Sequence, residues 1–346
     1  MKIGILTFHW ATNYGAVLQS FALQHTIKKL GHKTYIINYK PWNTDINLYS
    51  LIRYRMILHP FKLLKDYSKE QLFIPFRDRF LFQTKRVKRA VRLSKLSENF
   101  DCIISGSDQV MNPSFLRFGE PNGSTAYYLG FGRDALRRVA YGVSFGTPKF
   151  PDDLLHVVEP LISRFNSLSV REQSGISIIG KMGRQDAILV PDPTLLLSGE
   201  DYERIIRIGE KHKKVCYYIL HNRKTLAERI KHNFAQEGVF ENNHCTVDRW
   251  LENIHGASCF ITNSFHGCVF SILFHIPFFV VLQTKENIGM NDRFYTLLNY
   301  LGLTDRILTE NDCDFSNAIP INWEEVEYRL QQYREIGMTF LKTSLQ

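Results

Sequence analysis

Apolar runs alternate with amphipathic stretches along the first half of the chain, and this alternation predicts a parallel α/β sheet. Residues 2–8 form a short apolar run typical of a buried strand, and a polar loop follows it. Residues 14–30 repeat apolar positions at helical spacing up to Gly31, a residue type that commonly ends a helix. A second apolar run, residues 33–39, completes a strand–helix–strand unit with the usual right-handed crossover.

The pattern continues with further strands and then begins again. Apolar runs at 100–107, 137–144, 165–172 and 186–193 predict more strands of the first sheet. A second alternation starts near residue 200, with strand-like runs at 213–221, 259–267 and 276–283 and helical patterns at 225–234 and from about Asn291. Two prolines and a turn-rich stretch, residues 191–202, mark the boundary between the two halves.

We therefore expect two α/β domains, residues 1–195 and 196–320. The interval of about 46–98 is longer and more helical than a simple crossover, so it predicts a helical insertion in the first domain. Residues 321–346 form an amphipathic pattern, and we expect this helix to pack back on the first domain.

Composition narrows the class of protein without naming a function. The 346 residues are 44% hydrophobic and 22% charged, which is ordinary for a folded protein with a sizeable core. No apolar run reaches the roughly 20 residues needed to cross a bilayer, and the first run is too short for a signal peptide, so we expect a cytoplasmic protein. The six cysteines are scattered without a CxxC pair, which favours reduced thiols over a zinc site or a disulfide framework.

A formal net charge of +9 indicates an anionic partner. No nucleic-acid-binding motif is present, so we expect no nucleic acid and favour small anionic substrates or the anionic face of a membrane. The interval 48–96 carries two basic clusters, interleaved in part with apolar and aromatic residues; a solvated helical surface is the equally weighted alternative. The clusters consist of Arg53, Arg55, Lys62 and Lys65, and of Lys85, Arg86, Lys88, Arg89, Arg92 and Lys95.

Polar residues follow several of the predicted strands, where ligands of open α/β sheets bind. Asn13 and Tyr14 lie in the loop between the first strand and first helix, where Asn13 offers donors and Tyr14 a stacking face to a sugar. The alternative is that Asn13 only caps the helix, and this loop taken alone favours that alternative.

The stretch DCIISGSDQVMNP places Ser107, Asp108 and Gln109 after a buried strand. Asp108 could take the proton of an attacking sugar hydroxyl, and Gln109 could hold a neighbouring hydroxyl. A turn that simply ends the strand is the competing interpretation, with about equal weight.

SLSVREQSG repeats this geometry with Arg171 and Glu172. The guanidinium of Arg171 suits bidentate binding of a phosphate or carboxylate, or else pairs with a carboxylate across the domain interface.

The strongest local pattern is CFITNSFHGCVFSILF, in which a strand turns into an apolar helix. Ser264 and His266 lie where the start of the helix attracts anions, and Gly267 would let a ligand approach the backbone. His266 could donate a hydrogen bond to a phosphate or act as an acid. The alternative is a structural histidine, which is the commoner case for a lone one, but its place in a strand-to-helix turn favours function.

These segments in this order resemble the polysaccharide pyruvyl transferase family, from residue 6 to about 303. The resemblance rests on LTFHWATNYGAVLQSFALQ, IISGSDQVMNP, YGVSFG, SVREQSG, VPDPTLLL, ITNSFHGCVFSILFHIPF and NDRFYTLLNYLGL. It implies a GT-B-like fold, two Rossmann-like domains facing across a cleft that holds the active site. It also implies phosphoenolpyruvate as co-substrate and an acceptor sugar that is often lipid-linked. Transfer from this donor requires no metal, and no cluster of metal-binding residues is visible in the sequence, so we expect no cofactor or metal.

The resemblance maps the family's anion-binding residues onto Arg171 and His266. Several relatives carry an arginine just before a Leu-His-Gly stretch, where this chain has Ser264-Phe265-His266-Gly267; Arg293 is our candidate for the missing cation.

The expected roles therefore fall into three groups. Asp108 is the base, and His266 or Glu172 is the acid. The donor is bound by Arg171, Ser264, His266, Gly267 and Arg293. The acceptor is bound by Asn13, Tyr14, Ser107 and Gln109.

Two other functions remain open for the same fold. One is a glycosyltransferase that uses a nucleotide sugar, which would release a nucleotide rather than phosphate. The other is a non-catalytic glycan-binding protein, since fold alone does not decide function.

Overall fold

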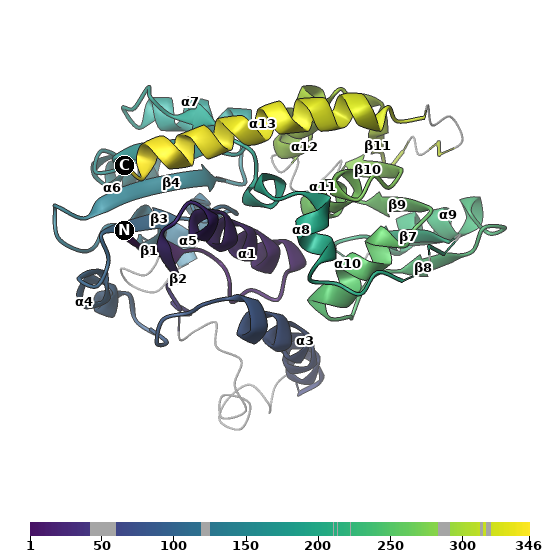
Figure 1. Ribbon diagram of the computed structural model, residues 1–346, viewed down its shortest axis with the longest axis horizontal. Coiled ribbons are helices and arrows are strands. Elements are labelled where there is room, and N and C mark those ends of the chain that lie inside the picture. The colour runs from purple at the N-terminus through teal and green to yellow at the C-terminus, as the bar shows by residue number, and fades with distance from the viewer. Residues whose placement is uncertain are drawn as a thin grey trace. The chain divides into compact units, whose positions relative to one another are not determined.

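A computed structural model describes residues 1–41, 60–118, 125–209, 211–212, 214–221, 223–282, 291–311, 314–315 and 320–346. The chain forms two compact units, Met1–Pro193 together with Met338–Gln346, and Thr194–Gly337 (Figure 1). Both chain ends belong to the first unit. Arg53 and Arg55, from the predicted basic cluster, lie outside the described residues.

The first unit is built on a six-stranded sheet in the order β2-β1-β3-β4-β5-β6, in which every neighbouring pair is parallel. Strands buried on both faces read as continuous apolar runs, which is why the sequence shows runs here rather than strict alternation. The strands are β1 (Lys2–Leu6), β2 (Lys33–Ile36), β3 (Cys102–Ser105), β4 (Arg137–Val143), β5 (Ser167–Val170) and β6 (Ile188–Leu189).

Helices connect these strands and bury their apolar sides against the sheet. Asn13 caps the first helix by accepting a hydrogen bond from the Ala16 N–H at 3.2 Å, and Gly31 follows that helix with φ of 87°. The α-helices are α1 (Tyr14–Lys29), α3 (Pro60–Phe80), α4 (Leu93–Ser97), α5 (Pro113–Phe118), α6 (Leu155–Ile162) and α7 (Gln173–Lys181). Short 3₁₀ turns are η3 (Ala90–Arg92), η4 (Ala126–Tyr128), η5 (Asp152–Leu154) and η6 (Pro193–Leu196), the last at the junction of the units.

The second unit has a parallel five-stranded sheet in the order β11-β10-β9-β7-β8. Its strands are β7 (Val215–Tyr218), β8 (Val239–Glu241), β9 (Cys259–Thr262), β10 (Phe278–Leu282) and β11 (Ile307–Thr309). Its helices are α8 (Gly199–Glu203), α9 (Lys224–Asn233), α10 (Val247–His255), α11 (Phe265–Leu273), α12 (Asp292–Leu301) and the 3₁₀ turn η8 (Thr304–Arg306).

The long helix α13 (Trp323–Ser344) begins in the second unit, and its residues from Met338 onward belong to the first. There the ring of Phe340 lies 6.0 Å from that of Tyr141, and Arg137 donates a hydrogen bond to the carbonyl of Ser344 at 2.9 Å. The end of this helix thus belongs to the first unit, as expected for residues 321–346, whereas its residues up to Gly337 belong to the second unit.

Both sheets have the same internal order, with the chain stepping to one side of the first strand and then to the other. The reversal falls between β1 and β3 in the first unit and between β7 and β9 in the second. In open α/β sheets the crevice beyond the carboxyl ends of the strands at such a switch point binds ligands. The predicted α/β class with two parallel, Rossmann-like sheets is confirmed; the cleft between the units stays a prediction.

Glycine at position 267 has a packing reason rather than a conformational one. A Cβ there would lie 2.7 Å from Thr262 Oγ1 and 3.0 Å from the Phe260 ring, so glycine lets α11 pack closely on β9. Thr262 cannot easily move aside, because its hydroxyl donates to the Tyr218 carbonyl at 2.7 Å.

Gly267→Ala should therefore destabilise the protein by about 1–3 kcal/mol, the usual effect of overpacking a close contact. Urea unfolding would measure the change. The control is Gly209→Ala, where no atom lies within 4 Å of the added Cβ and the change should stay within about 0.5 kcal/mol. Equal stability of the two variants would contradict the packing explanation.

Candidate functional site

The switch point of the first unit gathers the polar residues predicted after β3. Asp108 has φ of 78°, a left-handed conformation uncommon for residues other than glycine. Its carbonyl accepts from Ser144 N–H at 3.0 Å, and its carboxylate accepts from Gln109 N–H at 2.8 Å. Strained backbone of this kind tends to occur at functional sites, and the Asp108 side chain is half-buried rather than enclosed.

Ser107 and Gln109 differ in what they offer to a ligand. The Ser107 hydroxyl is fully buried and lies 2.9 Å from the Gly142 carbonyl and 3.2 Å from Asp192 Oδ2. It therefore joins strand ends to one another. The predicted contact between Ser107 and an acceptor sugar is wrong, because the buried hydroxyl is not accessible to a sugar. Gln109 is half-buried, and its side-chain oxygen faces the Asn112 amide at 3.4 Å.

Arg171 follows β5 and is buried, with 2% of its surface exposed. Its Nη1 donates to Asp192 Oδ2 at 2.7 Å, and its Nε lies 3.6 Å from Glu172 Oε2. Burial alone would lower the pKa of Arg171, but the charges of Asp192, Glu172 and Asp108 outweigh burial and raise it. The guanidinium thus pairs with carboxylates of its own unit, and we reassign it from binding the donor to positioning these strand ends.

Glu172 belongs to the same buried cluster. Its Oε1 accepts from the Phe145 N–H at 3.1 Å, which joins the end of β5 to the turn after β4. The carboxylate also lies beside Arg171 and is thereby engaged in holding two strand ends together. This arrangement disfavours Glu172 as the acid.

The predicted residues of the first loop also act mainly in folding. Asn13 caps α1, as its alternative interpretation held. The Tyr14 ring is 3% exposed and lies 5.0 Å from the Phe73 ring, so it is part of the core and does not present a stacking face to a sugar.

The switch point of the second unit is the turn between β9 and α11. Asn263 spans it, because its side chain accepts from the Leu220 N–H at 2.7 Å and donates to the Leu220 carbonyl at 3.3 Å. Ser264 caps α11 and accepts from the Gly267 N–H at 3.4 Å. His266 is in the first turn of this helix, where backbone N–H groups and the helix dipole favour an anion.

Arg293 lies beside this turn, although it is 27 positions away from His266 in the chain. Its guanidinium carbon is 5.5 Å from the centre of the Phe265 ring and 5.6 Å from that of Phe294. The structure therefore brings Arg293 against the ring of Phe265, the first residue of α11.

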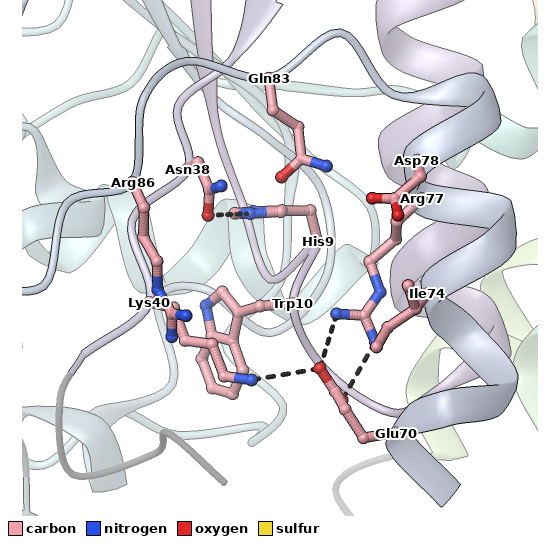
Figure 2. A pocket seen from close by; sticks show the side chains of 10 residues that line it. All are labelled: His9, Trp10, Asn38, Lys40, Glu70, Ile74, Arg77, Asp78, Gln83 and Arg86. Carbon is pink, nitrogen blue, oxygen red and sulfur yellow. Dashed lines mark hydrogen bonds and ion pairs between the residues drawn. The ribbon is translucent and has the colours of Figure 1, made fainter. Parts of the chain in front are cut away.

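The structure also forms a polar pocket that we did not predict from the sequence. A pocket of about 270 Å³ lies beyond β1 and β2 and against α3, all within the first unit (Figure 2). His9 and Trp10 sit in the loop that we assigned to Asn13 and Tyr14, whereas the rest of the lining comes from distant segments. The lining consists of His9, Trp10, Asn38, Lys40, Glu70, Ile74, Arg77, Asp78, Gln83 and Arg86.

A buried charge triad forms one wall of the pocket. Arg77 binds Glu70 through both terminal nitrogens, each at 3.0 Å, and Lys40 Nζ reaches the same carboxylate at 3.3 Å from another side (Figure 2). Burial would raise the pKa of Glu70, but its hydrogen bonds and the charges of Arg77 and Lys40 lower it below the ordinary value. Glu70 is therefore ionised at neutral pH.

His9 forms the base of the pocket and is 1% exposed. Its Nδ1 lies 3.2 Å from the Thr7 carbonyl and its Nε2 3.3 Å from Asn38 Oδ1. Burial lowers the pKa of His9 to about 4, and the two hydrogen bonds offset this only in part. The ring is neutral at physiological pH and adds no charge to the pocket.

No metal site emerges from the described part of the chain, where no group of three or more His, Cys, Asp or Glu side chains is placed to hold an ion. In the same residues no helix combines the length and apolar character needed to span a bilayer. The five cysteines that the structure describes are free thiols.

The chain contains two open parallel sheets, each with polar turns at its switch point. This architecture defines an α/β protein of the class that binds ligands at strand ends. The chain belongs to the polysaccharide pyruvyl transferase family, whose model matches residues 13–283. The family predicted from the ordered sequence segments is thus confirmed, and with it a transferase.

Solved structures resemble the chain more distantly. The UDP-GlcNAc 2-epimerase of Methanocaldococcus jannaschii, in complex with UDP-GlcNAc and UDP, is 11% identical, with 96% of this chain and 93% of that chain covered at a TM-score of 0.49. The glycosyltransferase SsfS6 of Streptomyces sp. SF2575, complexed with thymidine diphosphate, is 10% identical, with 99% of each chain covered at a TM-score of 0.43. Comparison with curated proteins gives no match.

The depressed pKa of His9 makes stability depend on pH in a defined direction. Below pH 6.5 the unfolded chain binds a proton that folded His9 does not bind until about pH 4, so its contribution to stability is present above pH 6.5 and is lost as the pH falls toward 4. Between pH 7.5 and pH 5 the loss should be about 2 kcal/mol.

Urea unfolding of the wild type and His9→Gln at these two pH values would measure this loss. The variant should lose about 2 kcal/mol less than the wild type on acidification, since it lacks the group that titrates. His232→Gln, at an exposed histidine, is the control and should behave like the wild type. An unchanged pH dependence in His9→Gln would refute the assignment.

Proposed function

We propose that this protein transfers the pyruvyl group of phosphoenolpyruvate onto two hydroxyls of one sugar, in a polysaccharide or a lipid-linked glycan precursor, and releases phosphate. The family supports a pyruvyl transferase acting on polysaccharides. The proposal depends most on the residues found at the switch point of each sheet. The first sheet has the strained, half-buried Asp108 there, and the second has His266 and Arg293 at the start of a helix.

The donor carries a phosphate and a carboxylate and needs cationic partners. The turn at the start of α11 offers backbone N–H groups, His266 and the guanidinium of Arg293 within one unit. Such preorganised donors stabilise charge that develops during transfer better than water does. We assign donor binding to Ser264, His266 and Arg293. Gly267, which we expected to take part, uses its N–H on Ser264 and its carbonyl on Ser271.

The chemistry needs one acid and one base. A proton added to C3 of phosphoenolpyruvate turns the methylene into a methyl group and makes C2 electrophilic; the first hydroxyl then bonds to C2 and gives its proton to Asp108. The second hydroxyl displaces phosphate from C2, and the C–O electron pair and that hydroxyl's proton leave with the phosphate. The protons therefore balance: the proton of the first hydroxyl makes up for the one added to C3, and the proton of the second hydroxyl leaves with the phosphate.

We assign the acid to His266 rather than Glu172. Glu172 accepts from the Phe145 N–H and lies beside Arg171, so it is engaged in holding strand ends together. His266 lies in the first turn of α11, at a helix start suited to the anionic donor, and histidine is the side chain most often used for proton transfer. The sugar belongs on the side of Asp108, with Gln109 beside it.

The reaction is tested by incubating the purified protein with phosphoenolpyruvate and candidate glycans, including lipid-linked ones. We expect a gain of one pyruvyl unit by mass, together with equimolar phosphate. Asp108→Asn keeps the size of the side chain but removes the base, and should lower turnover by about 100-fold or more.

Asp134→Asn is the matched control, because Asp134 is a fully exposed carboxylate paired only at the surface with Arg164. Its turnover should equal that of the wild type. Near-normal turnover in Asp108→Asn would exclude Asp108 as the base, and release of a nucleotide from a nucleotide sugar would replace pyruvyl transfer by glycosyl transfer.

We also propose that the second basic cluster contacts an anionic membrane surface near a lipid-linked acceptor. Its six Lys and Arg residues between 85 and 95 are all exposed, and Phe82 and Val91 expose 58% and 67% of their surfaces beside them. Exposed apolar side chains among cations are typical of interfacial binding.

Removing two of these charges, Arg89→Gln with Arg92→Gln, should weaken binding to phosphatidylserine vesicles by about tenfold or more, since each cation near the surface contributes about 1 kcal/mol. Vesicle flotation would measure it. Lys211→Gln with Lys231→Gln removes two exposed charges of the second unit and should have no effect. Equal flotation with neutral phosphatidylcholine vesicles would dismiss the membrane contact.

A further inference from the structure

The pocket beyond β1 and β2 has the features expected of a sugar-binding site. It is lined by hydrogen-bonding side chains on several sides, with the flat indole of Trp10 among them (Figure 2). Trp10 is half-buried, and its N–H is directed to the Tyr127 hydroxyl at 3.4 Å, so its ring is held in place. A fixed aromatic face surrounded by a few polar groups suits a ligand with one apolar face and several hydroxyls.

Its charge distinguishes it from a site for a neutral sugar. Two cations, Lys40 and Arg77, share one carboxylate, Glu70, and all three are more than nine-tenths buried. Arg77 uses both terminal nitrogens on Glu70 and so neutralises it. Lys40 makes one hydrogen bond to Glu70 and keeps further N–H groups for another acceptor.

No other group in the lining balances this excess charge. His9 is neutral because burial lowers its pKa to about 4. Asp78 and Arg86 are exposed and carry opposite charges. Because two buried cations share one carboxylate, an anion that enters the pocket and accepts from Lys40 gains a charge-assisted hydrogen bond beyond its other contacts.

The pocket is also connected to Asp108 within the first unit. Thr7, whose carbonyl is bound by His9, donates its hydroxyl proton to the Ser107 carbonyl at 3.0 Å. Ser107 directly precedes Asp108 in the chain, so this hydrogen bond links the loop of His9 to the residue proposed as the base.

From this arrangement we infer that the pocket is the subsite for an acceptor sugar that carries a negative charge, with Lys40 bound to the anionic group and Trp10 against the sugar ring. The inference rests on the proposed function only in calling the sugar an acceptor. The anionic group is a carboxylate, as in a hexuronic acid, or a phosphate, as in a sugar phosphate.

The experiment measures binding to the full chain without phosphoenolpyruvate, by saturation-transfer NMR or calorimetry. The probes are glucose, glucuronate, glucose 1-phosphate and inorganic phosphate. We expect at least one of the two anionic sugars to bind about tenfold more tightly than glucose, or about 1.4 kcal/mol. A preference for glucuronate identifies a carboxylate, and a preference for glucose 1-phosphate identifies a phosphate.

Lys40→Met leaves the Glu70–Arg77 pair balanced and should abolish the preference for anionic sugars while glucose binds as before. The control is Lys85→Met, an exposed lysine outside the lining, which should keep the preference. If Lys40→Met does not fold, Arg86→Gln at the exposed edge of the pocket decides, with an expected loss of several-fold in anion affinity alone. Trp10→Leu should weaken all three sugars.

Three results would overturn the inference. One is no preference for either anionic sugar, or no binding of any sugar at millimolar concentration. Another is a preference that persists in the folded Lys40→Met variant, or in Arg86→Gln where that variant decides. The third is inorganic phosphate binding as tightly as glucose 1-phosphate, which would leave a simple anion site. Because donor and turnover are absent from the assay, failed pyruvyl transfer with intact binding would refute the proposed function alone.

Discussion

The buried guanidinium of Arg171 is the group on which the strand ends of the first unit depend. An arginine with 2% exposure is tolerated only beside compensating charge, and Asp192 and Glu172 supply it from the ends of neighbouring segments. Glu172 in turn fixes the Phe145 N–H, and Asp192 lies against the Ser107 hydroxyl. The turns after β3, β4, β5 and β6 are thereby joined into one rigid edge, from which Asp108 extends with its strained backbone.

The parallel topology places this edge where open α/β sheets bind their ligands. Parallel strands direct all their carboxyl ends to one side of a sheet, and the reversal of strand order leaves a crevice there. The two units use this constraint differently: the first holds carboxylates around Arg171, whereas the second offers a helix start with His266 and Arg293. In the reaction that we propose, the first unit takes a proton from a hydroxyl through Asp108, and the second unit binds the anionic donor.

The pocket beside α3 adds a second kind of electrostatic control. Arg77 and Glu70 lie seven positions apart on α3, about two turns, so they share a face and the long Arg77 side chain reaches back to the carboxylate. Lys40, brought in from beyond β2, leaves the interior with one positive charge in excess. A neutral His9 keeps this excess from growing, so the charge of the pocket depends on a single lysine.

The sequence by itself determined the α/β class, the succession of strands and helices, and the family, because buried parallel strands leave continuous apolar runs and polar turns follow them. It also located Asp108 and the start of α11, since both adjoin such runs directly. Only the tertiary structure decided that Arg171 forms an ion pair with Asp192 and that the Tyr14 ring packs against Phe73. It also decided that Arg293 contacts the Phe265 ring and that His9, Lys40 and Arg77 line one pocket. Burial and charge pairing depend on which distant segments the sheet order brings together, and local periodicity carries no record of that order.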